Sequence, residues 1–282
     1  MGLVLLRPTV RVCAIVPAFD AASTVGEVVR SLRACWPEPD AVIVVDDGSG
    51  DATGRIASEA GAVVLCHPDN RGKGAALCTA MRHALDAGFD FAVTVDADGQ
   101  HPAAEALRLL HAPAEPRALV LGVRDLAGAG APKKNRASNA ISNFFLSLFS
   151  GQRLADTQCG LRRYPIATTL ALGAGGQGYA FEAEVLLRAI RARVPVVEVP
   201  IEVVYPPGRV THFHSVRDPA RIVARVVATM LGPRPVVPSP DRDGAALEPA
   251  RSSAAPSGEG RASRPSSDAT TPPEAAPPAG PP

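Results

Sequence analysis

Acidic side chains follow three of the short apolar runs in this sequence, at the point where each run ends. Asp20 follows the first run, the pair Asp46-Asp47 follows the second, and the segment Asp96–Gln100 follows the fourth. Two carboxylates one residue apart, followed by an amide side chain, supply the hard oxygen ligands that Mg²⁺ or Mn²⁺ prefers. A metal ion held there would bridge a diphosphate and neutralise the leaving group. The sequence therefore predicts a divalent-cation site with three ligands, which are Asp96, Asp98 and Gln100.

Each of these motifs also has an ordinary structural explanation when it is taken alone. An isolated Asp-x-Asp is usually a solvated loop, and Asp46-Asp47-Gly48-Ser49 is more often a turn that precedes a helix. Acidic residues at several strand ends of one sheet are much less expected by chance. The joint pattern favours a functional site.

The elements that would position these side chains alternate along the chain. Buried strands are predicted at Arg11–Val16, Ala41–Val45, Ala62–Leu65, Phe91–Val95 and Leu119–Gly122. Helices are predicted between them at Thr24–Ala34, Thr53–Glu59, Ala75–Asp86 and Ala103–Leu110. This alternation predicts an α/β fold, a mostly parallel sheet with helices on both faces. Ligands of such sheets bind beyond the carboxyl ends of the strands, where the acidic residues fall.

After Gly122 a different pattern begins. Apolar residues recur with the spacing of one helix face at Ala137, Ala140, Ile141, Phe144, Phe145, Leu148 and Phe149. We expect this face to pack into the core rather than to form a lipid groove. The facing residues are uncharged, and they include Asn139, Ser142, Asn143 and Ser147. A further helix is predicted near Phe181–Arg193, followed by a strand pair near Val196–Val204 that is broken at Pro200.

Composition limits the remaining possibilities. Residues 1–232 are expected to form one catalytic domain, and the Pro/Ala/Ser-rich residues 233–282 a disordered tail. A net charge of +1 gives no field that favours nucleic acid. The five cysteines are widely spaced, which argues against a disulfide framework or zinc site and fits a reducing cytosol. No apolar stretch approaches the roughly 20 residues that span a bilayer.

Two other enzyme classes, dehydrogenases and nucleotidyltransferases, are disfavoured because the sequence lacks the glycine-rich motifs that they carry. Asn70-Arg71-Gly72-Lys73-Gly74 lacks the order of a phosphate-binding loop, so we interpret it as a helix N-terminus with Lys73 as an optional contact. No Gly-x-Gly-x-x-Gly follows the first strand, which disfavours a dehydrogenase. A nucleotidyltransferase would carry a Gly-rich, basic signature at the end of strand one, and Val16–Asp20 lacks it.

Six motifs occur in an order that matches a known family. They are Val16–Phe19, Val45–Ser49, Asn70–Gly74, Asp96–Gln100, Gly122–Arg124 and Asp156–Gly160. Together they make residues 11–225 similar to family 2 glycosyltransferases of the GT-A fold. The resemblance is to the branch that contains dolichyl-phosphate mannose synthase and bacterial polyprenyl-phosphate glycosyltransferases. It implies a Rossmann-like nucleotide-binding sheet.

The resemblance also implies roles for individual residues. Positions that cradle the nucleotide base and ribose match Pro17, Phe19, Val45 and Asp47. The donor diphosphate and metal motif matches Asp96, Ala97 and Asp98, with Gln100 as an added metal ligand. Arg124 matches an arginine that contacts phosphate, and Asp156 matches an acidic residue that faces the acceptor. Residues 181–184 resemble an acidic helix start that lines the same cleft.

Two positions depart from the family pattern. Ala21 stands where the family often has a glutamate, which affects base recognition, and Thr211-His212 stands where a Ser-Lys pair is common. Arg209 is our candidate to replace that lysine as the phosphate contact.

The implied reaction is inverting transfer from a UDP- or GDP-linked sugar. A polyprenyl phosphate acceptor is already anionic, so positioning and leaving-group neutralisation would supply most of the rate. A hydroxyl acceptor would need a base, for which Asp156 is the candidate; a buried structural carboxylate is the competing interpretation. A degenerate nucleotide-sugar-binding protein is the non-enzymatic alternative.

A basic amphipathic pattern near the end of this region suggests where the protein acts. Arg217, Arg221 and Arg225 repeat at helical spacing beside an apolar strip, which is compatible with an anionic membrane surface; a solvated helix face is the commoner explanation. We therefore expect a cytoplasmic protein that can lie peripherally on the inner face of the cell membrane.

Overall fold

The computed structural model describes residues 10–128, 131, 133–175, 180–204, 225–235 and 237. The chain divides into two units, Met1–Pro249 and Ala250–Pro282, and every described residue belongs to the first. Apart from residues 233–235 and 237, the predicted tail lies outside the described residues, so its disorder and the boundary at Pro233 remain predictions.

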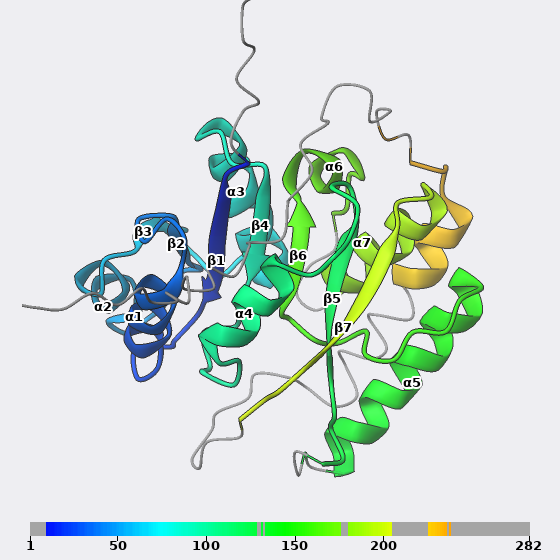
Figure 1. Ribbon diagram of the computed structural model, residues 1–282, viewed down its shortest axis with the longest axis horizontal. Coiled ribbons are helices and arrows are strands. Elements are labelled where there is room, and N and C mark those ends of the chain that lie inside the picture. The colour runs from blue at the N-terminus through cyan, green and yellow to red at the C-terminus, as the bar shows by residue number, and fades with distance from the viewer. Residues whose placement is uncertain are drawn as a thin grey trace, which may run out of the picture. The chain divides into compact units, whose positions relative to one another are not determined.

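Within the described residues, seven strands form one sheet in the order β3-β2-β1-β4-β6-β5-β7 (Figure 1). Their bounds are β1 Val12–Ala18, β2 Val42–Asp46, β3 Val63–Cys66, β4 Phe91–Thr94, β5 Leu119–Arg124, β6 Arg162–Pro165 and β7 Val196–Ile201. β6 runs antiparallel to β4 and β5, and the other neighbouring strands are parallel. The predicted mostly parallel α/β sheet is confirmed, and five of its strands lie within two residues of their predicted bounds. The predicted strand pair near Val196–Val204 is instead the single strand β7.

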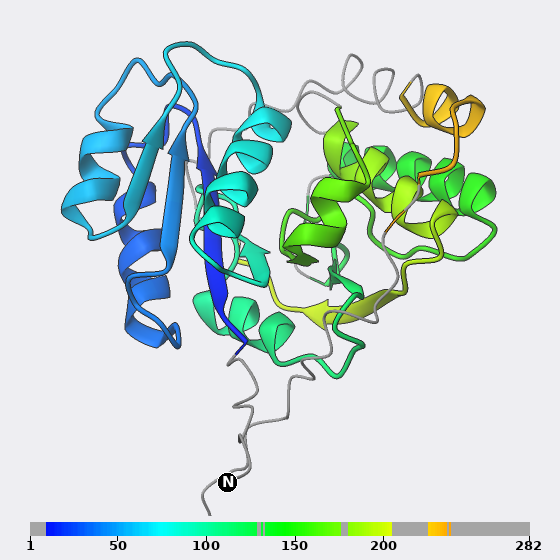
Figure 2. The same ribbon diagram turned by 90° about the horizontal axis from the view of Figure 1, so that it is seen from above.

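Helices cover both faces of the sheet, as predicted (Figure 2). One face carries α1 Val25–Cys35, α2 Thr53–Glu59 and α4 Ala103–Leu110. The other carries α3 Lys73–Asp86, α5 Lys133–Ser150, α6 Ile166–Ala171 and α7 Ala180–Arg191. Because both faces are covered, β1, β2 and β4 are buried along most of their length, which is why they are continuous apolar runs.

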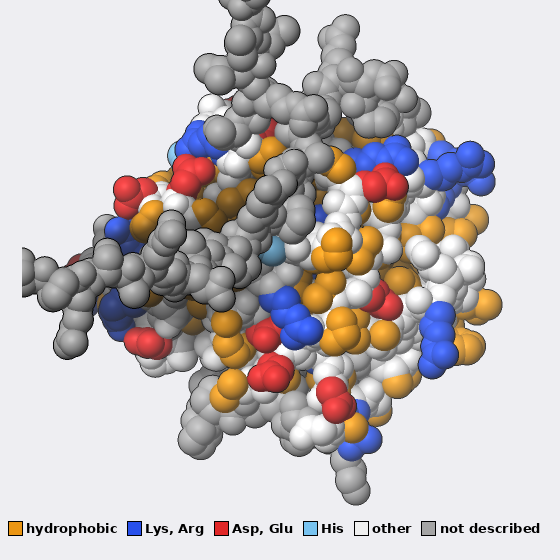
Figure 3. All heavy atoms as spheres, in the orientation of Figure 1, with side chains coloured by type: hydrophobic (Ala, Val, Ile, Leu, Met, Phe, Trp, Pro, Cys, Tyr) orange, Lys and Arg blue, Asp and Glu red, His pale blue; other side chains and the backbone are white. Residues whose placement is uncertain are grey.

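The predicted core packing of the α5 apolar face is wrong for its most exposed residues. Ile141, Phe144 and Leu148 are 50%, 63% and 62% exposed, whereas Phe145 and Phe149 are half-buried. The opposite, uncharged face carries the buried residues, with Asn139 and Ser142 only 5% and 6% exposed. Hydrophobic side chains are visible at the surface in the region of α5 in Figure 3. The physical reason is that the Ser and Asn side chains of α5 form hydrogen bonds with the loop that leads into β6. This polar face of α5 therefore points inward, and the apolar face points outward.

None of the helices in the described ranges combines the length and the apolar composition that crossing a bilayer requires.

Candidate active site

Asp47, at the end of β2, organises the loop that precedes α3. Its side chain is almost fully buried, and its carboxylate accepts the N–H groups of Arg71 (3.1 Å) and Gly72 (2.7 Å). His67 Nδ1 lies 2.6 Å from the same carboxylate. Gly72 has φ +88°, so the chain turns sharply at this point and α3 begins with Lys73. The geometry assigns Asp47 a positioning role, and its predicted contact with the nucleotide stays a prediction.

The loops after β1 and β2 are bound to each other. The Asp20 N–H donates to Ser49 Oγ (3.0 Å), and the Gly50 N–H donates to Asp20 Oδ1 (2.8 Å). Asp20 has φ +47°, a left-handed conformation that asparagine and aspartate tolerate better than most residues. These bonds fix the polar rim at the carboxyl ends of both strands.

The remaining residues predicted to contact the base differ in burial. Pro17 and Phe19 are half-buried beside the rim, whereas Val45 is fully buried in the core. Any contact between Val45 and a base therefore has to come from its backbone.

Asp96, just after β4, lies in a network of opposite charges. Lys73 Nζ is 2.6 Å from Asp96 Oδ1 and 2.9 Å from Glu182 Oε1, and Glu182 belongs to α7. His101 Nε2 lies 3.9 Å from Asp96 Oδ2. Burial alone would raise the pKa of Asp96, but the Lys73 ammonium, His101 and Arg124 lower it to about 2. Asp96 is therefore a carboxylate throughout the neutral range.

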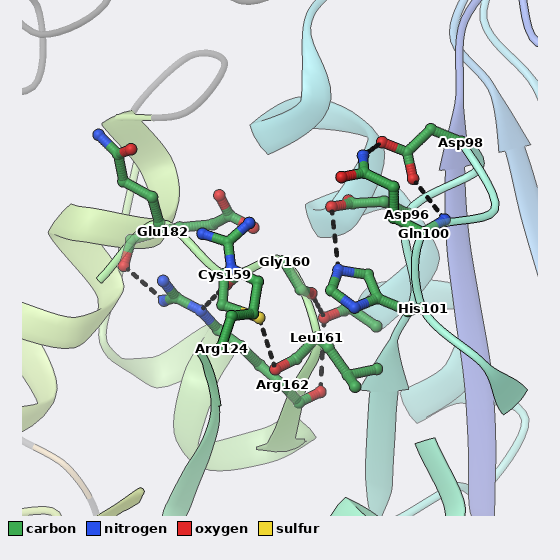
Figure 4. Close-up of polar contacts among 12 residues, drawn as sticks. Asp96, Asp98, Gln100, His101, Arg124, Cys159, Gly160, Leu161, Arg162 and Glu182 are labelled. Carbon is green, nitrogen blue, oxygen red and sulfur yellow. Dashed lines mark hydrogen bonds and ion pairs between the residues drawn. The ribbon is translucent and has the colours of Figure 1, made fainter. Parts of the chain in front are cut away.

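Asp98 and Gln100 turn toward each other beyond Asp96 (Figure 4). The Gln100 N–H donates to Asp98 Oδ1 (3.1 Å), and the Gln100 side-chain amide contacts Asp98 Oδ2. His101 is buried, and this burial lowers the pKa of its imidazole, while the Asp96 carboxylate acts in the opposite direction. The site thus contains two carboxylates, an amide and an imidazole.

This donor set fits a hard divalent cation. Two carboxylates and an amide oxygen are ligands that Mg²⁺ and Mn²⁺ accept, and Mg²⁺ commonly takes its further ligands from substrate phosphates. The described residues contain no cluster of three or more His, Cys, Asp or Glu side chains arranged to hold a metal ion. Asp96, Asp98 and Gln100 would therefore hold a cation together with a bound diphosphate.

Gly160 makes room for the Asp96 carboxylate. A Cβ atom at position 160 would lie 2.3 Å from Asp96 Oδ2 and 2.6 Å from Asp96 Oδ1, which is far inside contact distance. Gly160 lies two residues before the first residue of β6. Because β6 runs antiparallel to β4, the start of β6 lies beside the end of β4, and Gly160 therefore lies close to Asp96. Thr94 Oγ1 donates to the Gly160 carbonyl (2.6 Å) and fixes this approach.

Arg124 and Asp156, both predicted site residues, are bound to each other. Arg124 Nε is 2.7 Å from Asp156 Oδ2, and Arg124 Nη2 is 3.0 Å from Asp156 Oδ1. The backbone N–H of Arg124 also donates to Asp156 Oδ2 (3.2 Å). Asp156 is 1% exposed. The carboxylate is thus used to orient the guanidinium at the end of β5.

The uncharged face of α5 holds the Asp156 loop, a role that sequence analysis missed. Ser142 Oγ lies 3.0 Å from Thr157 Oγ1. Asn143 Oδ1 accepts the Thr157 N–H (2.8 Å), and Ser147 Oγ accepts the Leu154 N–H (2.9 Å). The signal was present in the sequence, since a row of Ser and Asn without any charge is unusual for a solvated helix face.

Two buried arginines at the start of β6 hold neighbouring segments. Arg162 donates to the carbonyl groups of Cys159 (2.9 Å), Thr157 (2.8 Å) and Glu182 (2.9 Å). Arg163 donates to the carbonyl groups at the end of α4, those of Leu110 (2.8 Å) and Ala112 (3.2 Å). Arg162 therefore joins the Asp156 loop to α7.

Of the other predicted residues, Ala97 is buried between the two acids, and Arg209 lies outside the described residues. Arg217, Arg221 and the departure at Thr211-His212 also lie outside them. Arg225 is described, and its Nε is 2.7 Å from Glu184 Oε2, so its charge is paired within the protein.

The chain is similar in sequence to a known protein family and to individual members of it. Residues 13–168 match the profile of the family described as Glycosyl transferase family 2. The chain is 31% identical over 202 residues to undecaprenyl-phosphate mannosyltransferase of Micrococcus luteus, covering 68% of this chain and 82% of the relative. It is 30% identical over 211 residues to polyprenol monophosphomannose synthase of Mycolicibacterium smegmatis, covering 70% of this chain and 78% of the relative.

A solved structure supports the fold. Glucosyl-3-phosphoglycerate synthase from Mycobacterium tuberculosis, in complex with Mn²⁺, UDP-glucose and phosphoglyceric acid, superimposes with a TM-score of 0.62. The match covers 78% of this chain and 79% of the other at 20% identity, so it concerns the fold alone.

Proposed function

Since the chain belongs to glycosyl transferase family 2, we propose that it transfers a sugar from a nucleotide-sugar donor to a polyprenyl phosphate, with inversion at the anomeric carbon. The observation that carries this proposal is the placement of Arg124 and the Asp156 loop beside the Asp96–Gln100 segment. β6 lies between β4 and β5 and runs antiparallel to both, so β4 and β5 point the same way and the residues at their carboxyl ends lie at the same end of the sheet. One group suits the donor diphosphate, and the other suits an anionic acceptor.

On the donor side, Asp96, Asp98 and Gln100 would hold Mg²⁺ or Mn²⁺ against the diphosphate. When bound, the cation supplies charge neutralisation for the departing nucleoside diphosphate. Asp96 is ionised and fixed by its neighbours, so its contribution needs no proton to leave first. The chain's own groups orient the donor, since the loops after β1 and β2 are bound together at the nucleotide rim.

On the acceptor side, the Arg124–Asp156 pair supports a phosphate rather than a hydroxyl. An arginine held by a carboxylate has its guanidinium fixed in one direction, which suits phosphate recognition. A phosphate oxygen is already anionic at pH 7, so no base is needed. The name of one relative contains undecaprenyl phosphate, and that of another contains a polyprenol monophosphate sugar, which supports a lipid-phosphate acceptor.

The alternative, a hydroxyl acceptor, would require Asp156 to remove a proton. Asp156 accepts three hydrogen bonds from Arg124 alone and is 1% exposed, which disfavours proton abstraction. The two candidates differ in the pH dependence of Asp156→Asn. Positioning predicts a lower kcat/KM at every pH with an unchanged profile, whereas loss of a general base predicts a profile that changes shape and a loss of about 10²–10⁴.

The exposed face of α5 supports a position on a membrane surface. Ile141, Phe144 and Leu148 lie on a stretch, residues 137–152, that carries no charged residue. Lys133, Lys134 and Arg136 precede this stretch, and Arg153 follows it. An apolar helix face with basic flanks is typical of helices that lie in the interface of an anionic bilayer. Arg225 is paired with Glu184, and Arg217 and Arg221 lie outside the described residues, so α5 is a second candidate membrane contact beside the predicted basic segment.

The proposed reaction is tested by transfer from radiolabelled UDP- and GDP-sugars to undecaprenyl phosphate in detergent with Mn²⁺. We expect transfer with one donor, and its loss in Asp98→Ala. Donor binding without transfer to any acceptor would instead identify a nucleotide-sugar-binding protein. Membrane contact is tested separately by flotation with anionic liposomes. Phe144→Ser/Leu148→Ser should abolish flotation, whereas Leu85→Ser, which removes a leucine that is 42% exposed on α3, should not.

A further inference from the structure

Lys73 connects the two halves of the site through a single ammonium group. It begins α3, and its Nζ lies within 2.9 Å of carboxylate oxygens from both Asp96 and Glu182. The lysine side chain is 16% exposed, Asp96 28% and Glu182 2%. A cation therefore already neutralises the first acid of the predicted metal site. Sequence analysis treated Lys73 only as an optional contact near the nucleotide.

The position of Lys73 is built into the fold. Asp47 fixes the backbone of Arg71 and Gly72, and Gly48, in a left-handed turn, packs directly against the backbone at Asp69. On the other side, the Glu182 carbonyl accepts a hydrogen bond from Arg162, which fixes the start of α7. Both ends of the contact are thus held by hydrogen bonds.

The Lys73 ammonium occupies the position between Asp96 and Glu182 that another cation could otherwise take. Removing the ammonium would leave two carboxylates around one position, and an uncompensated buried charge is strongly unfavourable. A divalent cation with oxygen preference would then be the natural replacement. With Lys73 in place, a metal ion that arrives alone has to displace an ion pair and meets a positive charge.

We propose that Lys73 excludes divalent cations from the donor-free site and admits them only together with a diphosphate. The diphosphate supplies the negative charge that draws the ammonium away from Asp96, and Asp96 then becomes available to the metal. Metal and nucleotide would therefore bind with strong positive coupling. The inference rests on the proposed function in one respect, that the ligand is a nucleoside diphosphate. Lys73 acts here as a positioning residue for Asp96.

The test measures binding of Mn²⁺ alone, without any nucleotide, by electron paramagnetic resonance. Wild-type protein should bind Mn²⁺ weakly, and Lys73→Met should bind it at least about tenfold tighter, a change of about 1.4 kcal/mol. Lys73→Arg, which keeps the charge, should behave like wild type. Arg71→Met is the matched control, because it removes a neighbouring positive charge whose side chain is exposed. Unchanged Mn²⁺ affinity in folded Lys73→Met would overturn the proposal.

A second variant keeps the test independent of folding defects. Lys73→Met/Glu182→Gln removes one of the two acids, so its Mn²⁺ affinity should return toward the wild-type value. Titrating Mn²⁺ in the presence of UDP or GDP gives the coupling, which should be large in wild type and small in Lys73→Met. If neither nucleotide binds wild type, the proposed donor class fails, whereas the Mn²⁺-only comparison still decides the role of Lys73.

Discussion

Arg124 and Asp156 form a two-bonded ion pair, with 2.7 Å and 3.0 Å between their side-chain atoms. The pair links the end of β5 to the loop before β6, two segments that are 32 residues apart. Its geometry matters because a guanidinium held at two nitrogens cannot rotate away from the direction in which it points. The Asp156 carboxylate is buried, and among the described residues Arg124 is the only one that forms an ion pair with it.

The ion pair should show strong coupling in stability. Arg124→Met leaves the Asp156 carboxylate buried without its cation and should lower the free energy of unfolding by about 3–5 kcal/mol. Adding Asp156→Asn removes the stranded charge, so the double variant should be less destabilised than the two single variants predict together. Urea denaturation of the four proteins measures this. Additive effects would mean that the pair contributes no interaction energy.

Gly160→Ala should weaken metal-dependent nucleotide binding. The new methyl group would meet both Asp96 carboxylate oxygens and push them from their place. We expect at least a tenfold loss of nucleotide affinity in the presence of Mn²⁺, about 1.4 kcal/mol, measured by calorimetry. Gly232→Ala is the control, because a Cβ atom there would come no closer than 3.4 Å to its neighbours. Equal affinities of the two variants would contradict the assigned role of Gly160.

Neighbouring apolar residues of α5 should differ sharply in their effect on stability. Phe144→Ser and Leu148→Ser alter exposed side chains and should change the free energy of unfolding by less than about 0.5 kcal/mol each. Leu146→Ala removes a side chain that is 1% exposed and should cost about 2–5 kcal/mol. Thermal or urea unfolding distinguishes the two outcomes. A large loss in Phe144→Ser would restore the core-packing interpretation of this face.

The cysteines should label in two classes. Burial raises the pKa of the Cys13 and Cys159 thiols to about 12, so at pH 8 almost none of either is in the reactive thiolate form. Cys66 is exposed and should react with a thiol reagent in the native protein. Cys13 and Cys159 should react only after unfolding, and raising the pH to 9 should not expose them. Mass spectrometry of labelled peptides reads out each site.

The first half of the fold was predictable because local pattern and tertiary structure agree there. β1 and β2 are buried on both faces, so each is a continuous apolar run, and the acids that follow them mark the strand ends. Helix α2 has the predicted bounds, and α4 does too. The cation site could be proposed from the sequence because its predicted ligands, Asp96, Asp98 and Gln100, are close together along the chain, and it stays a prediction.

The second half was predictable only in part. Helix α7 begins and ends within two residues of the helix predicted at Phe181–Arg193, but β6 and the packing of α5 depend on partners far apart in sequence. β6 reads Arg-Arg-Tyr-Pro, which has no apolar run, yet all four residues are buried. The two arginines donate to carbonyl groups up to 53 residues away, and sequence alone does not reveal these partners. α5 was misjudged for a related reason: its apolar face was assigned to the core by periodicity, but its polar face has the more specific partners.

The adjacent arginines of β6 bear on how the sheet avoids mispairing. Consecutive strand residues point to opposite sides, so Arg162 reaches toward α7 while Arg163 reaches the end of α4. A shift of the register by one residue would point each arginine to the opposite face of the sheet. Both guanidinium groups would then be buried in apolar surroundings without their carbonyl partners. A strand of four residues is too short for alternating polar and apolar side chains to fix its register. The two arginines fix the register instead. The same alignment keeps Gly160 beside Asp96, so correct strand pairing and assembly of the predicted cation site depend on the same register.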